Sequence, residues 1–466
     1  MMRALPFAAL LLAGCASVER APPASVAVAE LPAGFALLDR ERAAAGTVAE
    51  LLPLGDPAYA ALEARAMAGA PTLEQALARI EAARAGVRGA RAEQLPSLDA
   101  SGTVARERIN TRQFGGLPPG IAIDRNRTAF NLGLSAGWDA DLFGRLRAGR
   151  RAAVARVDAA DADAQAVRVS LRADIARAVI DLRAVDAREA VARRDAASAA
   201  ELVSITRVRS QAGIAPGFDL VRAEALEADV RGRLAGIGAE RAAAIGRLVT
   251  LTGAPAQVVV DALRGPGGEA AAGTPVLAVP AVLLRARPDV AAAERRLAAA
   301  DADVAAAAAE RFPRLNVTAA LGLFALGLGG LFDDEALTGS VGGGLAGPLL
   351  DFGRVGSRID ARRAAAREAF AGYRGALFNA LGETEAALGT LAAADRRAAA
   401  LERQAGVDVD ATGLARERYR RGLDSFLTVI DAERAAFGSR SNAIEARADA
   451  GRARVALYRA IGGEAR

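Results

Sequence analysis

Apolar residues recur every three or four positions along two very long tracts of the chain, which is the spacing of an α-helix. The first tract runs over 145–212 and the second from 354 to the C-terminus, and neither contains a proline. At a rise of 1.5 Å per residue, a straight helix over the first tract is about 100 Å long. We therefore expect rods rather than a single globular core, with alanine-rich surfaces that let helices pack closely, as in coiled coils.

A glycine-centred break ends the first tract and interrupts the second. The first break is Gln-Ala-Gly-Ile-Ala-Pro-Gly at 211–217, and the second is Arg-Gly-Leu-Asp-Ser at 421–425. Glycine ends a helix through a left-handed residue, and proline or serine can begin the next helix. We predict two antiparallel helical hairpins with tips near 213–217 and 422–425, both at the same end.

Between the helices, apolar residues alternate with small or polar ones, which is the period of a β-strand. The alternation predicts β-hairpins at about 97–141 and 314–350. On the alternation alone, a strand of a soluble sandwich is favoured over a membrane strand that faces lipid on one side. A membrane helix over the uncharged stretch 315–332 is a further alternative. Its glycines, its alternation and the charges of the matching stretch near 99–108 argue against that helix.

The two halves of the chain repeat the same unit. Pro71–Leu98 matches Pro288–Leu315 at an offset of 217, and from Leu142 onward the offset is 209, so that Gly213 matches Gly422. The eight-residue difference is explained by an insertion at the turn-like stretch 115–120. We expect a first repeat at 71–253, a connector at 254–286 and a second repeat at 287–466.

The N-terminus has the pattern of an export signal. Residues 1–14 carry one arginine and then an apolar run too short to span a bilayer. Leu12-Ala13-Gly14-Cys15 resembles the lipobox of bacterial lipoproteins, which implies acylation of Cys15 and a lipidated N-terminal segment at 15–70. The alternative is a plain signal peptide with a cysteine there by chance. Since Ala16 is not the aspartate of inner-membrane retention, the resemblance implies the outer membrane.

An exported chain with β-hairpins between long helices has nowhere obvious to bury a sandwich, so its context favours membrane strands. Two strands per repeat give four per chain, and the smallest membrane barrels have eight. Open sheet edges are not tolerated in lipid, so the chain must assemble with copies of itself. Two copies would give eight strands and three would give twelve, and the residues alone do not choose between them.

The composition excludes most site chemistry. The chain has no histidine and one cysteine, so a histidine-dependent triad, a Cys/His zinc site and an internal disulfide are all ruled out. The Gly-x-Ser-x-Gly pattern at 133–137 is therefore explained by strand alternation. We expect no enzyme activity, no metal and no cofactor apart from the covalent lipid on Cys15. The 60 basic and 55 acidic residues are interleaved, which argues against a nucleic-acid partner.

Several motifs, in this order along the chain, resemble the TolC-like outer-membrane factors and, within them, the NodT-type efflux lipoproteins. They are the lipobox at Cys15, Asp56-Pro57, Phe-Gly-Arg at 143–145 and 352–354, Arg287-Pro288-Asp289 leading to Phe312-Pro313-Arg314-Leu315, Tyr419-Arg420-Arg421-Gly422, and Leu427-Thr428-Val429-Ile430-Asp431-Ala432. The resemblance implies a mixed α and β membrane protein. Three copies would form a twelve-stranded β-barrel in the outer membrane, continuing into a long α-helical barrel.

The resemblance also implies the partners and the functional residues. The partners are two further copies, outer-membrane lipid, a periplasmic adaptor and an inner-membrane pump of the resistance-nodulation-division type. The hairpin tips would dock the adaptor through Ala212, Gly213, Ile214, Arg421, Gly422 and Leu423. A periplasmic gate would consist of Leu427, Asp431 and Arg434, because a leucine ring excludes water and a carboxylate ring favours cations. The alternative is that Asp431 and Arg434 are an ordinary surface pair on one helix.

These expectations together indicate a passive trimeric duct for drugs or other small molecules. The alternative is a trimeric coiled-coil structural or adhesive surface lipoprotein. Internal duplication with antiparallel hairpins disfavours that alternative, because the helices of stalk proteins run in one direction.

Overall fold

The computed structural model of the protein describes residues 24–38, 43–44, 47–110, 126–265, 267–268, 274–275 and 280–463. The predicted signal peptide at 1–14, the lipid attachment site at Cys15 and the inserted turn at 115–120 lie outside these ranges.

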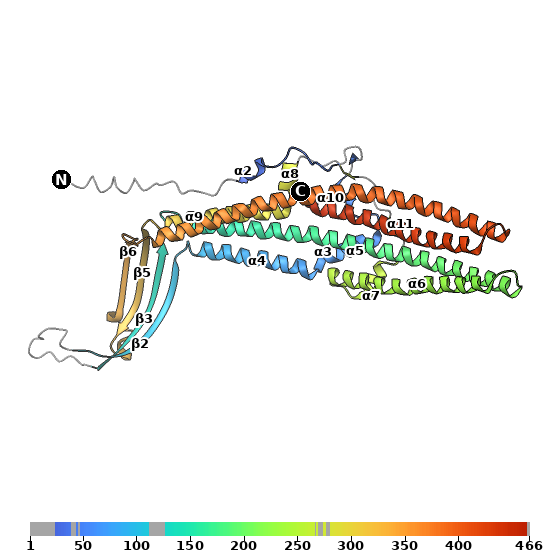
Figure 1. Ribbon diagram of the computed structural model, residues 1–466. Helices are drawn as coiled ribbons and strands as arrows, with labels where there is room; N and C mark the ends of the chain where they lie inside the picture. Colours follow the sequence, from blue (N-terminus) through green and yellow to red (C-terminus); the bar gives the residue numbers. More distant parts are fainter. Residues whose placement is uncertain are drawn as a thin grey trace, which may run out of the picture. The chain divides into compact units, whose positions relative to one another are not determined.

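Within these ranges the chain is mainly helical, and the same order of parts occurs twice (Figure 1). The first repeat contains α4 (Pro71–Ala92), β2 (Ser97–Arg108), β3 (Asn126–Asp139), α5 (Arg145–Gln211) and α6 (Gly217–Thr252). The second contains α9 (Pro288–Ala309), β5 (Arg314–Ala325), β6 (Leu337–Ala346), α10 (Arg354–Arg420) and α11 (Phe426–Ala460). The stretch weighed as a membrane helix is therefore largely strand β5.

Shorter elements precede and join the repeats. They are α2 (Ala24–Ala29), β1 (Ala43–Ala44), η1 (Val48–Leu51), α3 (Pro57–Gly69), α7 (Ala256–Ala262), β4 (Thr274–Pro275), α8 (Pro280–Arg285), η3 (Leu328–Gly330) and η4 (Asp334–Ala336). The connector is tied to the N-terminal segment, because β4 pairs in parallel with β1. The sequence pattern did not predict this pairing.

The main sheet of the described residues has four antiparallel strands in the order β2-β3-β5-β6. Ser97 pairs with Gly137 in the first hairpin, and Arg314 pairs with Ala346 in the second. These partners differ by the offsets of 217 and 209 that the sequence repeat gave. The two hairpins are therefore equivalent in register as well as in sequence, and the strands β2 and β6 form the two outer edges of the sheet.

One face of the sheet is apolar and largely exposed in the isolated chain. Residues opposite one another in antiparallel strands point to the same face, so the register places Leu134 beside Leu321 and Leu132 beside Leu323. Val341, on strand β6, is 84% exposed. The opposite face carries Asn131, Ser135 and other small or polar residues. Such a sheet has the surface of a membrane strand array, apolar toward lipid and polar toward water.

The chain forms two compact units, which share the long helices. The first unit, apart from residues outside the described ranges, comprises 80–159 and 294–372 and contains the sheet. The second comprises 24–79, 160–293 and 373–466. The main core of the second unit brings together the N-terminal segment and several long helices, with Tyr59, Leu182, Leu248, Leu391 and Tyr458 all nearly or fully buried.

Asp56-Pro57 and Arg287-Pro288-Asp289 are structural motifs of the second unit. The Asp56 carboxylate caps α3 by accepting from the Ala58 amide at 2.9 Å. It also accepts two bonds from Arg183, at 2.9 and 3.1 Å. Arg287 is 5% exposed and donates to Asp289 at 2.7 Å and to Glu383 at 2.8 Å. Proline begins the helix in each motif, as the sequence predicts for the second.

Among the helices of the described ranges, none alone combines the length and the apolar composition of a membrane span. The pair α6 and α7, bent by 105°, meets both criteria only when taken together.

Candidate functional site

The two hairpin tips have the same backbone geometry. Gly213 and Gly422 both have a φ of +70°, in the left-handed region that favours glycine. The amide of Ile214 donates to the Arg209 carbonyl at 2.9 Å, and the amide of Leu423 donates to the Arg418 carbonyl at 2.9 Å. This closure is that of a Schellman motif. It leaves the six residues of the proposed docking motifs, 212–214 and 421–423, exposed to solvent.

The second tip is held more tightly than the first. The Asp424 carboxylate accepts from Arg418 and from the Thr428 hydroxyl, both at 3.0 Å, and these bonds lower its pKa below the usual range. Ser425 caps α11. In the first tip, Pro216 occupies the corresponding cap position and provides no side-chain bond. The two tips therefore share a backbone turn but present different side chains.

The tip regions of the two hairpins pack against one another within the second unit. A core cluster joins α5, α6, α10 and α11 through Leu202, Leu226, Phe426, Val429 and others. The Arg209 guanidinium lies over the Tyr419 ring, 4.7 Å from its centroid. Burial raises the pKa of Tyr419 above its ordinary value. This packing fixes which face of α11 is free.

The predicted gate residues lie together on the free face of α11. Phe426, Val429 and Ile430 are buried, whereas Leu427 is 44% exposed and Asp431 and Arg434 are exposed. The spacing of the three gate residues, four and then three positions, places them on one side of a helix. Among the described residues, Asp431 and Arg434 make no hydrogen bond or ion pair with each other or with other groups, unlike the surface pair weighed as an alternative.

Two buried acidic residues, one on α11 and one on α5, were missed by the sequence analysis. Glu433 is 1% exposed and pairs with Arg416, and Asp195 is 5% exposed and pairs with Arg440 at 2.8 Å. Burial raises the pKa of Asp195 to about 6, although Arg440 acts in the opposite direction. One signal was available: Glu433 follows Val429 by four positions and precedes Phe437 by four, so it falls on the apolar stripe of α11.

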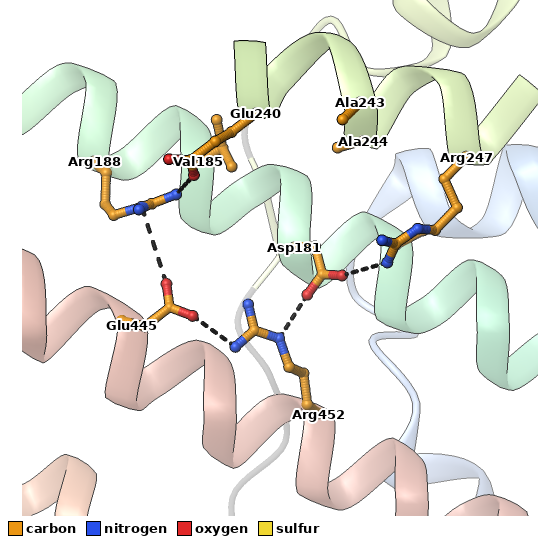
Figure 2. A pocket seen from close by; sticks show the side chains of 10 residues that line it. Asp181, Val185, Arg188, Glu240, Ala243, Ala244, Arg247, Glu445 and Arg452 are labelled. Carbon is orange, nitrogen blue, oxygen red and sulfur yellow. Dashed lines mark hydrogen bonds and ion pairs between the residues drawn. The ribbon is translucent and has the colours of Figure 1, made fainter. Parts of the chain in front are cut away.

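Farther along the second unit, a row of alternating charges connects three helices around a cavity of about 330 Å³. Asp181 of α5 lies between Arg247 of α6 and Arg452 of α11 (Figure 2). It accepts hydrogen bonds from Arg247 at 3.1 Å and from Arg452 at 2.6 Å. Arg452 continues the row to Glu445 at 2.7 Å. Positive and negative groups are paired throughout, so the cavity offers a ligand no excess charge. Its arrangement is suited to joining helices.

No group of three or more cysteine, aspartate or glutamate side chains in the described ranges is placed to hold a metal ion. The two tips and the exposed face of α11 present an array of exposed side chains on packed helices. Such an array can contact other chains or line a pore.

A family model for "outer membrane efflux protein" matches residues 62–254 and 279–463 of the chain. The two matched stretches correspond closely to the two repeats.

Two curated relatives are similar over nearly their whole length. The pyoverdine export outer membrane protein OpmQ of Pseudomonas aeruginosa is 29% identical over 464 residues, covering 98% of this chain and 95% of OpmQ. Nodulation protein T of Rhizobium leguminosarum bv. trifolii is 27% identical over 438 residues, covering 92% of this chain and 90% of the relative.

A solved structure agrees in fold. The outer-membrane channel OprN has a TM-score of 0.81 and 31% sequence identity, with coverage of 94% of this chain and 95% of that chain.

Proposed function

Since the chain belongs to the outer membrane efflux protein family, we propose that its periplasmic end is opened and closed by Leu427, Asp431 and Arg434. The protein is the outer-membrane channel component of an efflux system and forms trimers that extend into the periplasm. Members of the family are ducts rather than enzymes, and they generally work with adaptors and inner-membrane pumps.

The observation that carries the gate proposal is the exposure of one face of α11 beside a fixed, buried face. In a trimer, three copies of Asp431 would surround one axis, with the Leu427 side chains one turn away. A ring of carboxylates in a narrow pore favours cations, and a ring of leucines resists wetting. Arg434 would pair with an acidic group of a neighbouring copy and so hold the closed form.

Single-channel conductance in a planar bilayer tests the gate. We expect the wild-type trimer to conduct weakly and the double variant Asp431→Ala, Arg434→Ala to conduct several-fold more, with a smaller preference for cations in the reversal potential. The matched control is Asp229→Ala, Arg233→Ala, which removes an exposed ion pair of α6 at 2.7 Å. A folded trimer of the gate variant that never conducts would contradict the proposal.

We also propose that the tips dock a periplasmic adaptor through Ala212, Gly213, Ile214, Arg421, Gly422 and Leu423. Support comes from their exposure, from the hydrogen-bonded turn at each glycine and from the resemblance of the second tip to the family motif. The same resemblance supports a pump of the resistance-nodulation-division type, and an adjacent pump gene of another class would contradict it.

Lipid attachment at Cys15 is a further part of the proposal. Support comes from the lipobox-like Leu12-Ala13-Gly14-Cys15, where the single cysteine of the chain occupies the acylated position. Several acyl chains give stable anchoring where one does not. We expect Cys15→Ser to abolish metabolic labelling with a fatty acid. Labelling that persists in the serine variant would show that the lipobox assignment is wrong.

A further inference from the structure

An aromatic contact marks the place where the two repeats meet within one chain. Phe143 lies between β3 and α5, and Phe312 lies between α9 and β5. Their rings are stacked, with centroids 4.6 Å apart and planes 14° apart. The contact lies just beyond the paired ends of β3 and β5, where Trp138 is opposite Val317. It therefore joins the exit of the first β-hairpin to the start of the second.

The sequence repeat identifies the equivalent of each partner. Phe143 corresponds to Phe352 at the offset of 209, and Phe312 corresponds to Leu95 at the offset of 217. Phe352 is 91% exposed and Leu95 is 59% exposed. Phe352 follows β6 and Leu95 precedes β2, so the two exposed residues stand beside the two outer edges of the sheet. Within one chain these edges are separated by β3 and β5.

We propose that Phe352 of one copy packs against Leu95 of the next copy, which repeats between chains the contact that Phe143 makes with Phe312 inside the chain. The inference rests on the trimeric duct. In a closed ring of three chains, contacts from first to second repeat alternate with contacts from second to first repeat. The four strands of one chain make only the contact from first to second repeat. The contact from second to first repeat requires another copy of this chain.

The same reasoning fixes the register of β6 against β2 of the next copy. Ala136 pairs with Ala319 across β3 and β5. Their equivalents are Leu345 on β6 and Gly102 on β2. Both lie on the apolar face of the sheet, because Leu345 is opposite Leu315 and Gly102 is opposite Leu132. A register shifted by one residue would place the apolar residues of β6 on the polar face of the sheet. The proposed register keeps them on the apolar face.

The turn that carries Phe352 has a defined backbone conformation. Phe352 has a φ of +53°, in the left-handed region. The turn is held by Asp351, whose carboxylate accepts from the amides of Gly353 at 3.0 Å and Val355 at 2.8 Å. These bonds hold the exposed aromatic ring in place, where another copy of the chain can cover it.

Cysteine crosslinking of the full-length trimer tests the contact. In the double variant Leu95→Cys, Phe352→Cys, a short bis-maleimide should link neighbouring chains and produce dimers and trimers on a denaturing gel. Each single variant should stay monomeric on the gel. The matched control is Phe143→Cys, Phe312→Cys, which should react within one chain and leave the mass of a monomer. Reaction of the control pair without any linkage of the test pair would overturn the proposal.

A second pair tests the register without changing the aromatic ring. Gly102→Cys with Leu345→Cys should form an intermolecular disulfide under copper-phenanthroline oxidation, whereas Gly102→Cys with Val341→Cys, four residues out of register, should not. Linkage of the out-of-register pair alone would overturn the register.

Light scattering on the same samples separates two kinds of failure. A trimer whose test pairs stay unlinked overturns only the Phe352–Leu95 contact, and a wild-type chain that never trimerises overturns the duct as well. Phe352→Ala should then lower the temperature at which the trimer dissociates by several degrees, and Phe352→Leu should restore part of that loss. Equal dissociation temperatures for wild type and Phe352→Ala would argue against the contact.

Discussion

At the scale of single residues, burial disfavours the ionised form of the Asp195 carboxyl group. It belongs to α5 and faces Arg440 and Glu433 of α11, Arg233 of α6 and Arg194 of its own helix. Burial raises its pKa from 3.8 to about 6, and Glu433 adds to the increase. The three arginines lower the pKa without cancelling this effect. The contact between α5 and α11 at Asp195 therefore favours the protonated carboxyl group, which forms in weak acid.

A pH-dependent stability follows from this shift. A carboxyl group with a raised pKa binds its proton more tightly in the folded chain than in the unfolded chain, so its ionisation between about pH 4 and pH 6 lowers the free energy of unfolding. Asn mimics the protonated acid. We therefore expect the melting temperature of the wild type, relative to Asp195→Asn, to fall as the pH rises through this range. Thermal scans from pH 4 to pH 7.5 measure the difference.

Asp56 provides a control of opposite sign. Burial alone would raise its pKa, but hydrogen bonds from Arg183 and from the Ala58 amide outweigh burial and lower it. Its contribution to stability is present above its unfolded pKa and is lost as the pH falls below about 4. Asp56→Asn should therefore be less stable than the wild type at pH 7, with the deficit shrinking in acid.

For Asp195, a difference in melting temperature between wild type and Asp195→Asn that stays constant with pH would contradict the raised pKa.

At the scale of elements, the long helices are joined by ion pairs as well as by apolar contacts. Arg452 of α11 pairs with Asp181 of α5 and with Glu445 of its own helix (Figure 2). The Arg452 side chain is 23% exposed. We expect Arg452→Ala to reduce the free energy of opening α11 by about 1–2 kcal/mol, because it leaves two partly buried carboxylates without a full complement of donors. Hydrogen exchange of the α11 amides measures this opening.

A neighbouring arginine is the matched control for Arg452. Arg447 of α11 pairs with Glu402 of α10 at 2.7 Å, but its side chain is 76% exposed. An exposed pair contributes between about 0 and 1 kcal/mol. Arg447→Ala should therefore leave the exchange of α11 nearly unchanged. Equal effects of the two substitutions would mean that the row of charges around Asp181 does not stabilise the helix packing.

The elements differ in how far the sequence could predict them. The strands and the tips follow from local patterns, namely alternation in 130–138 and glycine at positions 213 and 422. The repeat predicts that the two hairpins are equivalent, whereas their register comes from the strand pairing in the structure. The pairing of β1 with β4 and the burial of Asp195 depend on segments far apart in the chain. No local periodicity contains that information. Asp431 and Arg434 were predicted as gate residues from the family resemblance, and their exposure depends on the packing of all four helices.

At the scale of the whole molecule, three chains present six hairpin tips of two alternating kinds. Each kind has one glycine with a φ of +70° and open space where a side chain would extend. A partner that engages several tips at once binds by avidity, so a modest weakening at each tip multiplies across the ring. An effect on docking should therefore be larger than the change at one tip implies.

Gly422→Asn tests the tips in the trimer. Asparagine tolerates the left-handed conformation, so the turn should form with a cost well below that of a β-branched residue. Its side chain would occupy the space a docked adaptor needs. We expect in-cell crosslinking to the periplasmic adaptor, identified by mass spectrometry, to fall at least five-fold while the trimer melts at nearly the wild-type temperature.

The control is Gly406→Asn, an exposed position within α10 that also has open space around it and lies far from the tip in sequence. It should leave the crosslinking yield unchanged, since Asn differs little from Gly in helix propensity.

The variant Gly213→Asn compares the two kinds of tip. If only the second kind binds tightly, as its more extensive hydrogen bonding around Asp424 favours, Gly213→Asn should weaken docking less than Gly422→Asn. Undiminished crosslinking in both tip variants would place the adaptor elsewhere on the trimer.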